Sequence, residues 1–179
     1  MKGATILFFA ALVSLLSGCS TYAVSRYSPD VDNVVALRSF EGNKIDVGVF
    51  TSSDSDKKEI MCRGVGPIKT PDGETYSDFV REAFIDELKM AEIYSDSASI
   101  ALSGNVDRID FSSTNGVWNL ALTVKSSTGE TVSVSEDYEY KTSFYGETAC
   151  NQTAQALMPA VQNLVGKVVR SQEFTRLVR

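Results

Sequence analysis

The stretch VWNLALTVKSSTGETVSVSEDYEY, residues 117–140, holds two runs in which apolar and polar residues alternate. A period of two residues is typical of a β-strand with one buried face and one solvated face. Between the runs lies Ser-Ser-Thr-Gly-Glu at 126–130, whose composition is typical of a turn. The stretch therefore predicts two antiparallel strands, with inward residues that begin at Trp118 and end with Tyr138 and Tyr140.

A third strand is expected just before this stretch, at residues 100–111, where apolar residues again alternate. The alternation slips by one residue near Asp107-Arg108, which predicts a β-bulge there. Asn115-Gly116, which follows, is a strong signal for a tight hairpin turn. Together the three strands are expected to form an antiparallel meander.

An amphipathic helix is expected before the meander. Apolar residues recur every three or four positions over residues 76–88, which is the helical period. Thr70-Pro71 suits the start of this helix as a capping residue followed by proline at the first turn, and Gly73 allows a later start.

A second helix is expected after the meander, because residues 154–169 carry another apolar stripe at helical spacing. Pro159 lies inside the stripe and is expected to kink or interrupt the helix. A short turn should then let Phe174 and Leu177 fold back onto the core.

Before the first helix, strands are expected at residues 34–40, 44–50 and 59–68. The order of elements is then strands, helix, meander, helix. This order predicts an α+β domain: an antiparallel sheet with a three-stranded meander and two helices packed on one face.

The N-terminus has the pattern of an export signal. Residues 4–16 are apolar apart from one threonine and one serine, and Lys2 precedes them. The run suits a signal peptide, whereas a membrane-spanning helix needs about 20 apolar residues. It ends at Leu16-Ser17-Gly18-Cys19, which resembles the lipobox of bacterial lipoproteins. The resemblance implies cleavage before Cys19 and acylation of that residue, which would anchor the chain in a membrane.

Ser20, rather than aspartate, follows the cysteine. By analogy with enterobacterial sorting, this favours the outer membrane, with the domain facing the periplasm. The chain is expected to divide into a signal peptide (1–18), a lipidated tether (19–33) and a single domain (34–179). An N-terminal strand packed on the domain is the alternative for residues 20–33.

Charge and composition exclude several functions. Removing residues 1–18 takes away Lys2 and no acidic residue, which changes the formal charge from −6 to −7. This charge argues against a nucleic-acid partner and against broad electrostatic binding to anionic lipid. The sequence contains no histidine, which excludes Ser-His and Cys-His catalysis and zinc sites built on imidazole. We expect no enzymatic activity, no cofactor and no metal site.

Three cysteines are present, and the assignment of Cys19 to lipid leaves Cys62 and Cys150. Two cysteines in an exported protein are typical of one disulfide. Two separate buried thiols are the alternative, because free cysteine also packs as a small apolar residue.

From Tyr76 onward, the order of elements resembles the YajG-like group of small bacterial lipoproteins. The resemblance rests on YSDFVREAFIDELKMAEIY at 76–94, the S-x-T-G-E turn of the meander, and a long C-terminal helix followed by a segment with Phe174. It implies the fold and an envelope location but no reaction, and it does not include Cys62 or Cys150. The same order is similar to LptE, the lipoprotein partner of the lipopolysaccharide translocon, and to auxiliary lipoproteins of lipid-transport ABC systems.

These features favour a membrane-anchored accessory or scaffold lipoprotein that binds an envelope partner through its sheet and loops. Aromatic residues are enriched at interfaces, so the candidate binding surface is Tyr138, Tyr140, Phe144 and Tyr145, although each of them also suits a core position. A lipid- or lipopolysaccharide-transport accessory is the alternative function.

The densest acidic cluster is Glu136, Asp137 and Glu139. Adjacent strand residues point to opposite faces, so Glu136 and Asp137 cannot form a facing catalytic pair. We interpret the cluster as a solvated strand edge.

Overall fold

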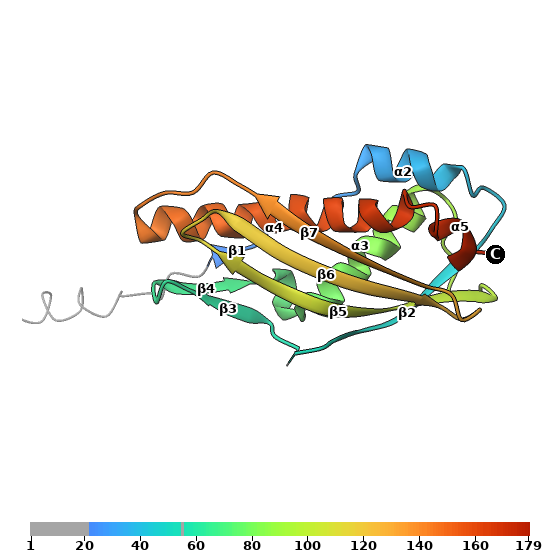
Figure 1. Ribbon diagram of the computed structural model, residues 1–179, viewed down its shortest axis with the longest axis horizontal. Helices are drawn as coiled ribbons and strands as arrows, with labels where there is room; N and C mark the ends of the chain where they lie inside the picture. The colour runs from blue at the N-terminus through green and yellow to red at the C-terminus, as the bar shows by residue number, and fades with distance from the viewer. Residues whose placement is uncertain (1–21, 55) are drawn as a thin grey trace, which may run out of the picture.

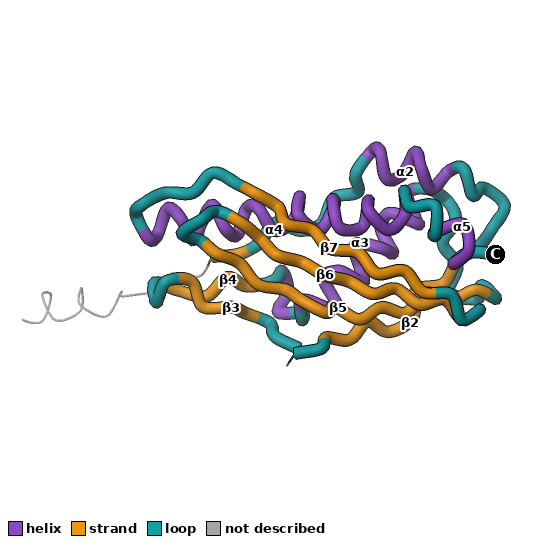
Figure 2. The backbone as a smooth tube through the Cα atoms, in the orientation of Figure 1, coloured by secondary structure: helices purple, strands orange, loops and turns teal. Residues whose placement is uncertain are grey.

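The computed structural model describes residues 22–54 and 56–179. The strands are β1 (Tyr22–Ala23), β2 (Ile45–Ser52), β3 (Glu59–Cys62), β4 (Gly66–Lys69), β5 (Ile100–Ser112), β6 (Val117–Ser126) and β7 (Thr131–Glu139). The helices are α2 (Val31–Arg38), α3 (Tyr76–Met90), α4 (Gly146–Val169) and α5 (Phe174–Leu177). Figures 1 and 2 show an elongated domain of helices and sheets, which confirms the predicted α+β class.

The main sheet has four strands in the order β2-β5-β6-β7. The predicted meander is confirmed, because β5, β6 and β7 pair antiparallel in sequence order. The sheet as a whole is mixed rather than antiparallel, because β2 pairs parallel with β5. A parallel pair needs a long crossover connection, and here the crossover contains β3, β4 and α3.

The bulge predicted in β5 is also confirmed, because the pairing with β6 shifts register between Val106 and Arg108. The register between β2 and β5 shifts as well, between Val47 and Phe50. Gly104 accommodates the second shift: a Cβ atom at this position would lie 2.5 Å from the Phe50 ring. A side chain at residue 104 would therefore clash with the core.

Helices α3 and α4 cover one face of the main sheet, as expected (Figure 1). α3 lies against β2, and α4 lies against β6 and β7. Trp118 on β6 is fully buried, and its indole N–H donates a hydrogen bond of 2.9 Å to the Thr153 carbonyl of α4. α4 is one continuous helix through Pro159, so the predicted interruption is wrong. Tertiary packing of a long apolar face outweighs the backbone hydrogen bond that a proline removes.

A second, smaller sheet has the order β1-β4-β3. The sequence predicted one strand over 59–68, but the chain reverses in the middle, where β3 and β4 form a hairpin. Arg63 and Gly64 make the turn with positive φ angles of 48° and 66°. Glycine adopts this conformation without strain, which explains why the hairpin turns at this residue.

Residues 34–40 were predicted to form a strand, and the structure corrects this to helix α2. The Asp30 side chain caps the helix by accepting hydrogen bonds from the backbone N–H groups of Asp32 and Asn33. Val34 and Leu37, three residues apart, are buried on the inner side of the helix. The cap supplies a start signal that outweighs the β-preference of the paired valines.

Residues 22–33 pack on the domain, which corrects the tether predicted over 19–33. β1 pairs with β4, and Val24 is buried. Glu87 on α3 binds the following segment through the Tyr27 hydroxyl at 2.6 Å and the Asp30 amide at 2.9 Å. The alternative of a packed N-terminal strand is therefore correct from Tyr22 onward. Cys19 and the predicted signal peptide lie outside the described residues.

The first long helix starts later than Thr70-Pro71. Residues Pro71–Gly73 form a single 3-10 turn, and α3 begins at Tyr76. Thr75 is its N-cap, with its side-chain hydroxyl accepting from the backbone N–H of Asp78 at 3.1 Å. Gly73, which allowed a later start, has a positive φ of 71° and separates the turn from the helix.

Candidate functional site

Three connections meet at one end of the long axis. They are residues 63–65 between β3 and β4, residues 113–116 between β5 and β6, and residues 140–145 between β7 and α4. Figure 1 shows these connections together at the end opposite α2 and α5. We call this region the loop tip.

Arg63 holds the three connections of the loop tip together. Its guanidinium donates to the Ser113 hydroxyl at 3.0 Å, to the Ser113 carbonyl at 2.7 Å and to the Phe144 carbonyl at 3.1 Å. A planar group with several fixed donors suits this task better than the point charge of a lysine. The contact between Arg63 and the other two connections gives the tip a defined shape.

The predicted Cys62–Cys150 disulfide is present, directly beside Arg63. It joins the end of β3 to the first turns of α4, with the two Cα atoms 5.9 Å apart. Both cysteines are fully buried. The disulfide thus links β3 to α4 next to the loop tip, while the hydrogen bonds of Arg63 link the three connections within it.

The structure divides the four aromatic residues of the predicted binding surface into two pairs. Phe144 and Tyr145 are 93% and 76% exposed, and their rings make an edge-to-face contact with centroids 6.1 Å apart. Tyr138 and Tyr140 are half-buried against the core, and the Tyr140 hydroxyl shares a 2.8 Å hydrogen bond with Thr153. The surface on the loop tip is therefore smaller than predicted and consists of Phe144 and Tyr145.

Because Phe144 and Tyr145 are exposed, we expect Phe144→Ala with Tyr145→Ala to change the free energy of unfolding by no more than about 0.5 kcal/mol. Thermal unfolding followed by circular dichroism measures this. Tyr140→Ala is the contrasting variant, because it removes a packed ring and a hydrogen bond. A loss of about 2 kcal/mol or more in the double variant would show that the exposed rings are packing residues after all.

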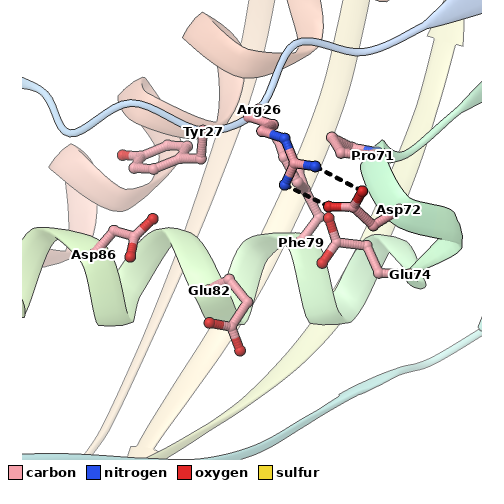
Figure 3. A pocket seen from close by; sticks show the side chains of 8 residues that line it. All are labelled: Arg26, Tyr27, Pro71, Asp72, Glu74, Phe79, Glu82 and Asp86. Atoms are coloured by element: carbon pink, nitrogen blue, oxygen red, sulfur yellow. Dashed lines mark hydrogen bonds and ion pairs between the residues drawn. The ribbon is translucent and has the colours of Figure 1, made fainter.

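A second candidate is an acidic pocket of about 280 Å³ between α3 and the N-terminal segment. Figure 3 shows the Arg26 guanidinium paired with the Asp72 carboxylate, with a hydrogen bond of 2.7 Å. Three further carboxylates, from Glu74, Glu82 and Asp86, line the same pocket. The pocket thus holds four carboxylates and one guanidinium.

Glu74 is the electrostatically unusual group of this pocket. Burial, together with the neighbouring carboxylates of Asp72, Asp78 and Glu82, raises its pKa from 4.5 to about 7, and Arg26 lowers it in part. The folded protein therefore keeps a proton on Glu74 after the unfolded chain has lost it. Stability must then fall as the pH rises from about 4.5 to 7.

We expect Glu74→Gln to remove the part of the pH-dependent loss of stability that comes from ionisation of Glu74. The variant should match the wild type at pH 4.5 and exceed it by about 1 kcal/mol above pH 7, after allowance for solvent screening at a partly exposed site. Urea unfolding at a series of pH values gives the difference. Other carboxylates with raised pKa values, such as Asp86 and Glu87, cancel in this comparison. A difference independent of pH would contradict the assignment.

A third candidate is an apolar patch where α2 meets the C-terminal end of α3. Val31, Val35 and Met90 are 74%, 61% and 54% exposed and line a shallow pocket of about 290 Å³. The patch lies at the other end of the molecule from the loop tip (Figure 1). It is a second exposed apolar surface, on helices rather than loops.

The acidic cluster on β7 is not a solvated edge throughout. Asp137 and Glu139 are exposed, but Glu136 points inward, where it is only 7% exposed. There it pairs with Lys167 of α4 at 2.7 Å and accepts from the Asn163 amide at 3.1 Å. The expected alternation of faces is correct, and the solvated-edge interpretation is wrong for Glu136 because α4 provides it with partners.

Within the part of the chain that the structure describes, no group of three His, Cys, Asp or Glu side chains has the geometry to hold a metal ion. None of the helices in that part is long and apolar enough to cross a membrane. No protein-family model matches the chain, and no curated protein is similar to it in sequence.

Proposed function

We propose that the protein is a bacterial envelope lipoprotein, anchored in the outer membrane through Cys19, that acts as a non-enzymatic accessory or scaffold. The observation that carries the proposal is Leu16-Ser17-Gly18-Cys19 at the end of a short apolar run. The packed domain begins at Tyr22, three residues after the cysteine. The anchor would therefore hold the domain close to the membrane rather than on a long tether.

The Cys62–Cys150 disulfide supports export. Structural disulfides are stable in oxidising compartments such as the periplasm and are rare in the reducing cytosol. The sequence resemblance to the YajG-like lipoproteins from Tyr76 onward implies the same location.

A binding role is supported by the way the exposed apolar side chains are held. Phe144 and Tyr145 are exposed to solvent. Their backbone is held by the hydrogen bond from Arg63 to the Phe144 carbonyl and by the disulfide at Cys150, five residues after Tyr145. Two exposed rings on a rigid support present apolar area at little cost in conformational entropy. We propose the loop tip as the surface through which the lipoprotein contacts the envelope.

The anchoring is tested by metabolic labelling with a fatty-acid probe in a bacterial host that processes lipoproteins. We expect the wild-type chain to be labelled and Cys19→Ala to lose the label, because acylation needs the thiol. Cys62→Ala with Cys150→Ala is the matched control and should stay labelled, since those sulfurs are buried in the domain. Label that persists in Cys19→Ala would contradict the proposal.

A further inference from the structure

We propose that the loop tip rests in the interfacial layer of the same membrane that holds the anchor, with Phe144 and Tyr145 inserted among the lipid headgroups. The inference rests on the acylation of Cys19 proposed above. The partner of the loop tip is then a lipid surface rather than a protein.

The direction of β1 points its N-terminal end, at Tyr22, toward the loop tip. β1 runs parallel to β4, with Tyr22 paired to Ile68. The N-terminal end of β1 therefore faces the Gly66 end of β4, which adjoins the 63–65 turn of the loop tip. From Ile68 to Gly66 the strand covers only about 7 Å.

The covalent reach of the chain then limits where the membrane can be. Cys19 lies three residues before Tyr22, and three residues span at most about 11 Å. A lipid on Cys19 would enter the bilayer within that distance of Tyr22. Because the tip is about 7 Å from Tyr22 along β4, the tip and the membrane surface would have to be neighbours.

The exposed side chains of the tip have the chemistry of an interfacial contact. Phe144 and Tyr145 are exposed on one connection, and Val65, which is 37% exposed, lies against Gly146, the residue that follows them. Tyr145 combines an apolar ring with a polar hydroxyl, which is favoured at the level of the headgroups, and Phe144 adds apolar area that can be buried at the headgroup–acyl boundary. A second membrane contact would also stop the domain from swinging freely about its anchor.

The charges around the rings balance. Arg63 and Lys141 are basic, Glu139 and Glu147 are acidic, and all four are exposed. The tip would therefore bind through its rings, without a requirement for anionic lipid. The apolar patch around Val35 lies at the far end of the long axis and would face away from the membrane (Figure 1).

The test places a tryptophan reporter at each end of the acylated full-length protein. Phe144→Trp reports from the loop tip and Val35→Trp from the far end, both at exposed positions. The native Trp118 is fully buried and gives a constant background that the wild type measures. Each protein is reconstituted in phosphatidylethanolamine–phosphatidylglycerol vesicles, with or without brominated phosphatidylcholine, and the mass of its N-terminal peptide is recorded.

If the inference is correct, the fluorescence emission of Phe144→Trp shifts to shorter wavelength on vesicles, and brominated lipid quenches most of it. The emission of Val35→Trp neither shifts on vesicles nor is quenched by brominated lipid. An acylated protein in which Phe144→Trp is unquenched would overturn the inference and leave the anchoring intact; the tip would then be a protein-binding surface. A protein without acyl groups on Cys19 would overturn the anchoring and the inference with it. Quenching that disappears without phosphatidylglycerol would contradict contact through the rings.

Discussion

Cys62→Ala with Cys150→Ala is expected to lower the free energy of unfolding by about 4–5 kcal/mol. The disulfide joins residues 88 positions apart. In the chain-entropy model, a cross-link that closes a loop of this length lowers the conformational entropy of the unfolded chain, which stabilises the folded protein by about 4–5 kcal/mol. For a domain of this size, the melting temperature should fall by about 10–15 °C. Alanine is the replacement because both positions are fully buried.

Urea unfolding of the wild type with and without reductant provides the matched comparison. The reduced wild type and the double variant should agree within about 1 kcal/mol, because both lack the cross-link and keep similar packing. A double variant as stable as the oxidised wild type would show that the bond contributes nothing to the fold. The loss should also loosen the loop tip, because Cys62 precedes Arg63 directly.

Trp118→Ala is expected to cost about 3–5 kcal/mol, the range for deletion of a large buried ring. The side chain is fully buried, and its ring lies against Phe111 and Tyr76, with centroids 4.8 and 6.3 Å away. Its indole N–H is also bonded to the Thr153 carbonyl, which ties the sheet to α4. Removing it opens a cavity between the two layers.

Trp118→Phe separates packing from the hydrogen bond. It retains most of the ring area and loses the N–H donor, so it should cost about 1–2 kcal/mol. Chemical unfolding followed by far-ultraviolet circular dichroism suits both variants, since each removes the single tryptophan that fluorescence would need. Equal costs for the two variants, or a cost below about 1 kcal/mol for alanine, would contradict the central position of this residue.

The meander could be predicted from the sequence because its strands are half-buried. In a strand with one buried and one solvated face, apolar and polar residues alternate along the sequence. A β-bulge shifts that alternation by one residue, as it does near Asp107-Arg108. The two long helices were predictable for the same reason, since each has one buried stripe. Local pattern and tertiary structure agree in these elements.

The N-terminal half was harder to predict because its elements depend on distant partners. Val34 and Val35 favour a strand by intrinsic preference, but α2 forms because Asp30 caps it and Leu37 is buried. Tyr27 occurs in a polar stretch that resembles a tether, yet its hydroxyl is bonded to Glu87, 60 residues away. No local pattern records such a contact.

The loop tip was only partly predictable. Phe144 and Tyr145 were predicted as part of a binding surface of four aromatic residues, but the sequence did not distinguish them from Tyr138 and Tyr140, which pack against the core. Arg63 was missed because its partners are backbone and hydroxyl groups of residues far along the chain. Its position beside Cys62 and Gly64, at a turn next to a disulfide, is the only sequence signal for its role.

The most direct test of the proposed anchoring is the mass of the N-terminal peptide of protein extracted from bacterial envelopes. We predict a peptide that begins at Cys19 and carries the mass of acyl chains on that residue, with Cys62 and Cys150 still linked. A mature chain that begins at Met1, or one in which Cys19 is an unmodified thiol, would contradict the account.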